Sequence, residues 1–324
     1  MSNIRPLSAA DLEAVIAIDE ATTGISRRGY FEKRLDAATD RPREYVYSGL
    51  EADGTLVGFA FAKLVNGEFG KPGASAALDA IGVAAAHGHK GYGQALLEEV
   101  ERVLAAKGVE RLTSQVEWAN GGMLGFLAGA GFALAPRTVL TRSTELMAQE
   151  LAGERADQWD TEPDFSSPEG DAADALSNEQ VIVRSMREGD LSKIIAIDKE
   201  NSGGDRTEYL TRKMHDTLHE SGVRVSLVAE MDEYPVGFIM ARVDFGAFGR
   251  TSAEAEMDTL GVDPGYQGQG IGRALMAQLI ANLAVLRVDT IRTEIDWNDT
   301  GLITYLDAMG FVPAQRLVLV RSLG

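Results

Sequence analysis

The sequence predicts an α/β protein made of two homologous domains in tandem, each a mixed β-sheet flanked by helices. Its 324 residues are about twice the size of a typical domain, and 45% of them are hydrophobic, enough for a buried core in each half. The two halves also repeat one another. Within each half, segments with strand-like spacing of apolar residues are interleaved with segments of helix-like spacing.

The repeat aligns at one constant offset of 179 residues. The offset carries residues 57–59 (Val-Gly-Phe) onto residues 236–238, and it carries Asp79 onto Asp258 without an intervening gap. Each repeat has the length of a domain, about 140 residues, and not that of a solenoid unit. We therefore expect one domain at residues 1–144 and a second domain at residues 181–324.

Residues 145–180, between the repeats, are strongly acidic. They hold eleven acidic residues and one basic residue, which is more than half of the excess behind the formal net charge of −18, and they include Pro163, Pro168 and Gly170. This composition is typical of a solvated linker. An acidic arm that steers a substrate is the alternative.

The composition excludes several classes of function. With no cysteine, the chain has no disulfide framework, no thiolate nucleophile and no cysteine-based metal site, which agrees with a reducing compartment. Neither a signal-peptide pattern nor an apolar run of membrane length occurs, so we expect a cytoplasmic protein without a membrane partner. The acidic balance disfavours a nucleic-acid partner and leans toward neutral or cationic substrates.

Alternating apolar residues and turn residues predict the strands of the second repeat. In order, they lie at residues 181–185, 224–230, 236–244, 255–262 and 290–297, and residues 311–320 supply the last strands. Pro235 and its acidic neighbours mark the turn between the second strand and the third.

Apolar residues at helical spacing predict the helices of the same repeat. In order, they lie at residues 190–200, 206–219, 270–286 and 301–309. The third helix has the clearest pattern, because Ile271, Leu275 and Leu279 fall on one face. Gly310 is the residue type suited to a left-handed cap that ends the fourth helix.

A glycine-dense loop lies where the strand at residues 255–262 gives way to the long helix. Its glycines include Gly268, Gly270 and Gly272, which let the backbone approach an anion, and the helix start adds N–H groups and a positive dipole end. The loop therefore predicts a phosphate cradle. A dinucleotide-binding fingerprint has a different glycine spacing and a Walker loop needs Gly-Lys-Ser/Thr, so the remaining alternative is a glycine turn that binds nothing.

Residues 267–272 (Gln-Gly-Gln-Gly-Ile-Gly) resemble the pyrophosphate loop of the GNAT N-acetyltransferase superfamily. A second match lies downstream, where Asn298, Gly301 and Tyr305 precede Gly310 as in the family's Asn-x-x-Ala-x-x-x-Tyr-x-x-x-Gly-Phe segment. Through the repeat, the resemblance covers both domains. It implies a GNAT fold with acetyl-CoA as cosubstrate and direct transfer of the acetyl group to an amine.

The resemblance also implies roles for single residues. Backbone N–H groups at Gln267, Gly268, Gly270 and Gly272 would hold the pyrophosphate of the coenzyme, with charge added by Arg273, and Asn298 would contribute to the same coenzyme site.

The reaction centre is expected where two strands splay apart. Backbone groups of Leu260 and Val262 would pair with the pantetheine arm, and an N–H group there would stabilise the oxyanion. Tyr305 matches the family's general acid, which protonates the departing thiolate, and a packing aromatic is the alternative for it.

An amine substrate arrives as an ammonium, so a base must accept a proton. Strict strand alternation places Glu254, Glu256 and Asp258 on the face that carries Leu260 and Val262. Glu256 is the first choice and Asp258 the second, acting directly or through a water; a solvated edge face is the alternative for the two glutamates. Asp258 recurs as Asp79, which indicates a shared structural or a shared catalytic role.

The two repeats differ where chemistry needs particular residues. Gln267, Asn298, Tyr305 and Glu256 of the second repeat correspond, in that order, to Gly88, Ala119, Phe126 and Ala77 of the first. We therefore expect the C-terminal domain to catalyse. The N-terminal domain would be degenerate: structural, a weak coenzyme site or part of the acceptor site. The arrangement is similar to that of tandem GNAT members with one inactive lobe, such as mycothiol synthases.

Weaker patterns complete the set of expectations. The histidines lack a third ligand, so no metal site is expected, and Trp118 and Trp297 are expected to pack beneath the last helix of each repeat, with an acceptor-site wall as the alternative. The leading hypothesis is an N-acetyltransferase for a small-molecule or peptide amine; the alternative is a non-catalytic acyl-CoA-binding or interaction protein. We expect the two domains to pair as an internal pseudo-dimer, which leaves two alternatives for the whole chain, a monomer or a homodimer.

Overall fold

The computed structural model describes residues 2–65, 74–145, 181–215, 217–218, 223–245, 248 and 253–323. Apart from Glu145, the segment predicted as an acidic linker lies outside the described residues, as does part of the end of the helix predicted at residues 206–219. The expected α/β class with two similar domains is confirmed.

The N-terminal lobe begins with a strand, two helices and a run of three antiparallel strands. Its elements are β1 (Ser2–Pro6), α1 (Leu12–Thr23), α2 (Arg28–Asp40), β2 (Tyr45–Ala52), β3 (Thr55–Leu64), β4 (Ser75–Val83), α3 (Tyr92–Ala106), β5 (Arg111–Glu117), α4 (Gly121–Gly129) and β6 (Ala133–Ser143).

The C-terminal lobe repeats this order. Its elements are β7 (Ile182–Ser185), α7 (Leu191–Ser202), α8 (Thr207–His215), β8 (Leu227–Met231), β9 (Tyr234–Phe245), β10 (Ala253–Val262), α9 (Ile271–Val285), β11 (Thr290–Asp296), α10 (Thr300–Ala308) and β12 (Val312–Ser322). The elements expected from the sequence are present within a few residues, and Gly310 after α10 has the expected left-handed conformation, with φ of 77°.

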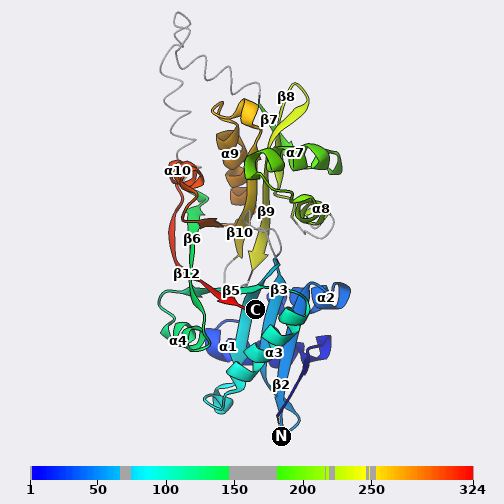
Figure 1. Ribbon diagram of the computed structural model, residues 1–324, viewed down its shortest axis with the longest axis vertical. Helices are drawn as coiled ribbons and strands as arrows, with labels where there is room; N and C mark the ends of the chain where they lie inside the picture. The colour runs from blue at the N-terminus through cyan, green and yellow to red at the C-terminus, as the bar shows by residue number, and fades with distance from the viewer. Residues whose placement is uncertain are drawn as a thin grey trace, which may run out of the picture.

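The strands of both lobes join in one sheet because the last strand of each repeat pairs with the other repeat. The strand order is β1-β2-β3-β4-β5-β12-β6-β11-β10-β9-β8-β7. β12 is antiparallel to β5 of the N-terminal lobe, while β6 is antiparallel to β11 of the C-terminal lobe. In Figure 1, β6 and β12 run side by side between the upper and lower lobes.

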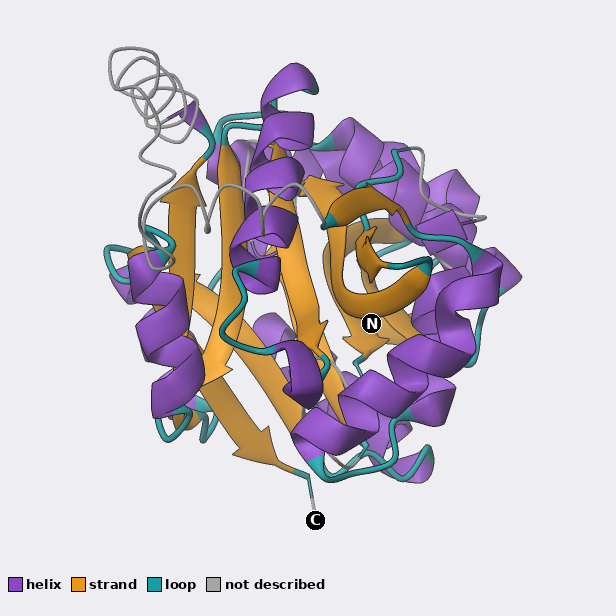
Figure 2. Cartoon of the chain, turned by 90° about the horizontal axis from the view of Figure 1, so that it is seen from above, coloured by secondary structure: helices purple, strands orange, loops and turns teal. Residues whose placement is uncertain are grey.

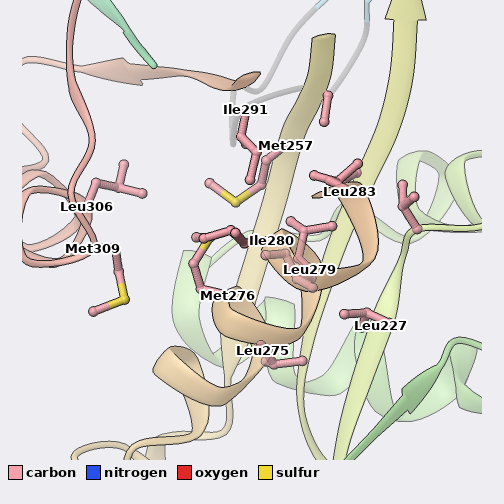
Figure 3. Packing of buried hydrophobic residues seen from close by; sticks show 14 of the residues in the cluster. Leu227, Met257, Leu275, Met276, Leu279, Ile280, Leu283, Ile291, Leu306 and Met309 are labelled. Atoms are coloured by element: carbon pink, nitrogen blue, oxygen red, sulfur yellow. The ribbon is translucent and has the colours of Figure 1, made fainter. Parts of the chain in front are cut away.

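Helices cover both faces of the strands in each lobe (Figure 2). In the C-terminal lobe, α9 packs on one face, where Met276, Leu279 and Leu283 meet Met257 and Ile291 (Figure 3). On the opposite face, α7 and α8 pack over β8 and β9 in a separate cluster. Burial on both faces follows from helices with one apolar stripe each.

The exchange of strands also exchanges core side chains. Leu140 of β6 is buried in the core under α9, although it belongs to the first repeat. Leu319 of β12, the equivalent residue at the 179 offset, is buried in the core under α3 of the N-terminal lobe. Each lobe is therefore completed by the chain of the other.

Polar contacts also reinforce the junction. Gln115 and Glu294, equivalent positions of the two repeats, meet there, with the Gln115 Nε2 donating to Glu294 Oε2 at 2.8 Å. Arg137 of β6 forms an ion pair with Glu294. The equivalent Arg316 of β12 pairs with Glu117 of β5 at 2.6 Å. The junction is thus organised about a pseudo-twofold axis.

The expected packing of the two tryptophans is wrong. Trp118 is 68% exposed and Trp297 is 55% exposed. Each follows the end of a strand, where its backbone N–H donates to the exchanged strand: Trp118 to Gln315 O at 2.9 Å and Trp297 to Pro136 O at 3.1 Å. This anchoring outside the strand leaves the indole rings out of the core.

The exchange of β6 and β12 predicts that a substitution in one repeat destabilises the lobe formed by the other repeat. Leu319→Ala, near the C-terminus, should destabilise the N-terminal lobe by about 2–5 kcal/mol, because it opens a cavity in that core. Hydrogen exchange followed by mass spectrometry should show the largest loss of protection in α3 and β2. Leu140→Ala is the matched control and should affect α9 instead; loss of protection within the mutated repeat alone would contradict the exchange.

Candidate active site

The two central strands of the C-terminal lobe separate at the place expected from the sequence. β10 is parallel to β11 only at the pairs Ala255–Ile291 and Glu256–Arg292. Its antiparallel pairing with β9 continues to Val262. Beyond Glu256, the edge of β10 that faces β11 is therefore open, and backbone groups on such an edge can pair with an extended ligand.

A β-bulge overturns the strict alternation that was expected along β10. The register with β9 shifts between Met257 and Thr259, so Asp258 is an extra residue without an opposite partner. As a result, Leu260 and Val262 pack with Met257 in the core under α9. The acidic residues Glu256 and Asp258 do not share this face.

Asp258 is held by the helix on the opposite face. Its Oδ1 accepts hydrogen bonds from the hydroxyls of Tyr209 and Thr259, each at 3.1 Å, and its Oδ2 forms an ion pair with Lys213 of α8. The N-terminal lobe keeps this arrangement at its own bulge, where Arg34 of α2 pairs with Asp79 at 3.1 Å. A cation at both equivalent positions favours a shared structural role for the two aspartates.

Glu256 lies in a buried cluster of charges. Its Oε2 is 2.5 Å from Arg242 Nη2 and 2.9 Å from Arg292 Nη2. Burial by itself raises the pKa of this carboxyl, but the guanidinium charges of Arg242 and Arg292 outweigh burial and hold the pKa well below its usual range. Such a carboxylate is poorly suited to accept a proton, so the geometry argues against Glu256 as the general base.

The glycine-rich loop has the geometry of an anion site. Gly268 and Gly270 have φ of 78° and 76°, which turns the backbone directly into α9. No side chain caps the start of α9, so its first turn presents N–H groups that have no acceptor within the helix. Arg273 is exposed in the same turn and adds a positive charge. A phosphate or pyrophosphate fits this chemistry.

The side chain of Gln267 binds the protein itself. Its Nε2 donates to Asn201 Oδ1 at 3.0 Å and to the Val262 carbonyl at 3.2 Å, and Asn201 Nδ2 donates to the same carbonyl at 3.0 Å. These bonds fasten the loop to the end of β10. Asn201 was not expected from the sequence. Its pairing with Gln267 has a trace there, since both residues are absent together from the first repeat, which has Thr22 and Gly88 at the equivalent positions.

Tyr305 reaches the start of α9 from α10. Its hydroxyl donates to the Gly272 carbonyl at 2.8 Å, and burial raises the pKa of the phenol above its usual range. The phenol carries its proton at neutral pH, as an unshifted phenol also does, so it is available as a proton donor, although burial makes it a weaker acid. Phe126 of the N-terminal lobe lies against Gly93 in the same way but has no hydroxyl.

Asn298 is exposed in the turn between β11 and α10. Its backbone N–H donates to Asp296 Oδ1 at 3.0 Å, while Asp299 caps α10 by accepting from the Leu302 N–H at 3.0 Å. The structure therefore brings the loop, Val262 and Tyr305 together through hydrogen bonds. Glu256 and Asp258 belong to the opposite side of β10.

In the described part of the chain, no group of three or more histidine, aspartate or glutamate side chains could hold a metal ion. No helix within the described ranges is long and apolar enough to cross a membrane.

The chain belongs to the acetyltransferase (GNAT) family. The model of this family matches it twice, over residues 13–132 and 191–311, which together exceed half of its length. Both matches end directly before the exchanged strands β6 and β12. The chain is therefore an acyltransferase whose two family domains form an internal pseudo-dimer.

Similar proteins align along nearly the whole length of the chain. The chain is 27% identical over 318 residues to a mycothiol acetyltransferase of Sanguibacter keddieii, covering 95% of this chain and 92% of that protein. A GCN5-related N-acetyltransferase from Sphaerobacter thermophilus superposes with a TM-score of 0.59 at 16% identity, covering 99% of this chain and 96% of the other. A tandem GNAT protein from the clavulanic acid biosynthesis pathway gives the same TM-score and identity, covering 100% and 99%.

The lowered pKa of Glu256 predicts a pH-dependent contribution to stability. A carboxyl whose pKa is lower in the folded state stabilises the fold above its unfolded pKa, and this contribution is lost as pH falls toward the folded pKa. Glu256→Gln should therefore lower the free energy of unfolding by about 3 kcal/mol at pH 7. The gap from the unsubstituted protein should narrow below about pH 4 in urea titrations.

Glu254→Gln is the matched control for this test. The Glu254 carboxylate is 3.4 Å from Arg292 and is more exposed than Glu256, so its loss should have a smaller effect, of about 1 kcal/mol or less. A stability gap for Glu256→Gln that stays constant from pH 7 to pH 3 would contradict the role of the ionised carboxylate.

Proposed function

We propose that this acyltransferase is an acetyl-CoA-dependent N-acetyltransferase that transfers the acetyl group directly to a primary amine of a small molecule or peptide. The C-terminal lobe carries the reaction. The single observation behind this proposal is the Tyr305 phenol, protonated and hydrogen-bonded to Gly272 beside the uncapped start of α9. The same short region thus offers an anion site and a proton donor.

The residues of the C-terminal lobe have distinct tasks in this reaction. Backbone N–H groups of Gly268, Gly270 and Gly272, with Arg273 nearby, bind the pyrophosphate of the coenzyme. The open edge of β10 at Leu260 and Val262 receives the pantetheine amides, and a backbone N–H of this edge stabilises the oxyanion that forms on the thioester carbonyl.

Two proton transfers accompany the transfer of the acetyl group from sulfur to nitrogen. The amine nitrogen forms a bond to the acetyl carbon, the carbon–sulfur bond breaks, and Tyr305 gives its proton to the leaving thiolate. The proton lost by the amine passes to water, because Glu256 and Asp258 are both held by cations. Asn298, in the turn before α10, contributes to the coenzyme site.

The acceptor is expected to be a small amine. The relative that aligns along 95% of the chain is a mycothiol acetyltransferase, whose name denotes a small-molecule substrate. The N-terminal lobe does not catalyse in this proposal, because Phe126 replaces the proton donor Tyr305. Its loop keeps the left-handed backbone of the catalytic lobe, with His89 and Gly91 at φ of 60° and 78°.

The proposed general acid predicts a separation of binding from turnover. Tyr305→Phe should lower kcat about 10²- to 10⁴-fold, because the proton for the thiolate is lost. The dissociation constant for acetyl-CoA should stay within about twofold, since Phe126 already occupies the equivalent place in the other lobe. Steady-state kinetics and calorimetry check this, with Phe126→Tyr as a control that should change neither value. Unaltered turnover in Tyr305→Phe would refute the assignment.

The proposed coenzyme site predicts which glycine matters for binding. Gly270→Asp places a carboxylate at the start of α9, where it repels phosphate and replaces the residue type that the left-handed backbone favours. Calorimetric titration with acetyl-CoA should show binding lost in this variant. Gly91→Asp at the equivalent position of α3 should leave the binding intact; the reverse pattern would move the coenzyme site to the N-terminal lobe.

A further inference from the structure

The exchanged strand β6 brings an arginine of the N-terminal repeat to the helix that carries Tyr305. Arg142 lies two residues beyond Leu140 on β6, and therefore on the same face of the sheet, and it is only 4% exposed. Its guanidinium lies against Gly310, just after α10: a Cβ added at Gly310 would be 3.3 Å from both Cζ and Nη1 of Arg142. The end of α10 therefore packs against a side chain of the other repeat.

One turn of backbone connects this end of α10 to Tyr305. The Met309 N–H donates to the Tyr305 carbonyl at 3.0 Å, and the Gly310 N–H donates to the Asp307 carbonyl at 2.8 Å. Gly310 then leaves the helix in a left-handed conformation, with φ of 77°. A guanidinium at this end is favourable, because the carbonyls of the last turn carry partial negative charge. Movement at Gly310 is thus transmitted to the turn that begins at Tyr305.

The other lobe has the equivalent contact as a hydrogen bond. Arg321 of β12 corresponds to Arg142, and its Nη1 donates to the Ala130 carbonyl at the end of α4. Arginine side chains near a helix C-terminus satisfy the last carbonyls in this way. The exchange of strands therefore places one arginine at the end of the last helix in each lobe. Only α10 carries a phenol, since α4 has Phe126 at the equivalent position.

The phenol of Tyr305 leaves little room for displacement of α10. A Cβ added at Gly272 would be 3.2 Å from Cε2 and 3.3 Å from the hydroxyl of Tyr305, and this hydroxyl donates to the Gly272 carbonyl at 2.8 Å. Because the ring extends from a helix of nine residues, a small rotation of α10 moves the hydroxyl away from this contact. A displacement of about 1 Å at a reacting group can lower a rate about a hundredfold.

We propose that Arg142 is a positioning residue for the reaction: the N-terminal repeat supplies it to the C-terminal lobe, where it fixes the last turn of α10 and thereby the Tyr305 hydroxyl. This role rests on the proposed function of Tyr305 as the proton donor. It gives the N-terminal repeat a task in catalysis that does not require the N-terminal lobe to bind coenzyme or acceptor.

The position of the phenol can be tested without any substrate. In the full chain with tyrosine isotopically labelled at Cζ for NMR, the Tyr305 signal is identified by its loss in Tyr305→Phe. Arg142→Met keeps an apolar stem but removes the guanidinium, so it should shift this signal and speed amide hydrogen exchange in α10. Arg321→Met is the matched control, and it should leave the Tyr305 signal unchanged while speeding exchange in α4.

Turnover then tests whether this position matters for the reaction. Thiol release from acetyl-CoA is followed with hydroxylamine as the probe acceptor, because hydroxylamine is mostly uncharged at neutral pH and needs no base. Arg142→Met should lower kcat at least about tenfold, while KM for acetyl-CoA stays within about twofold. Arg142→Lys restores the charge without the planar guanidinium and should recover part of the loss. Arg321→Met should keep kcat within about twofold.

A double substitution separates positioning from a general loss of stability. In the Tyr305→Phe background, Arg142→Met should cause no further loss of kcat, because no hydroxyl is left to position. A purely structural role would lower kcat by the same factor in both backgrounds. Thermal unfolding verifies that each variant is folded at the assay temperature.

Three results would overturn the proposal. They are an unchanged Tyr305 signal in Arg142→Met, equal losses of kcat in Arg142→Met and Arg321→Met, and an equal loss from Arg142→Met with and without the Tyr305 hydroxyl. If the unsubstituted protein releases no thiol from acetyl-CoA, the proposed function is what fails. The ligand-free Tyr305 signal then still decides whether Arg142 holds the phenol in place.

Discussion

The reciprocal pairing of the two terminal strands is the constraint on which the rest of the structure depends. β6 completes the sheet of the C-terminal lobe against β11, and β12 completes the sheet of the N-terminal lobe against β5. Each strand satisfies backbone groups that would otherwise form an exposed sheet edge, and each contributes a leucine to the core of the opposite lobe. Neither repeat has a complete core from its own residues, so the lobes are held in one fixed arrangement.

The two repeats share the residues that the fold requires, and they differ at a position proposed to take part in the reaction. Both have a bulge with a buried aspartate and a cation, Asp79 with Arg34 and Asp258 with Lys213. Both begin their long helix from a left-handed glycine. Tyr305, by contrast, has Phe126 as its counterpart. This division agrees with the proposal that only one of the two joined domains performs the reaction.

The charges near the junction give Glu256 a structural role. Glu256 lies between Arg242 and Arg292 near the seam, where each charge is compensated by its neighbours. In such a cluster, the arginine charges stabilise the ionised form of the carboxylate, which makes the carboxylate a weaker base. The same residue type on an open strand face would have been a reasonable base, so its environment decides its role.

The sequence by itself determined the two domains, the order of helices and strands, the glycine loop and the difference between Tyr305 and Phe126 at equivalent positions, because these follow from local spacing and from a repeat that survives at one offset. The tertiary structure alone decided which strand completes which lobe, since pairing between distant strands leaves no trace in local periodicity. It also decided that Glu256 is held by two arginines and that Asp258 is a bulge residue. A single extra residue in β10 reverses the face of every later side chain, and the partners that hold a buried carboxylate come from elements distant along the chain.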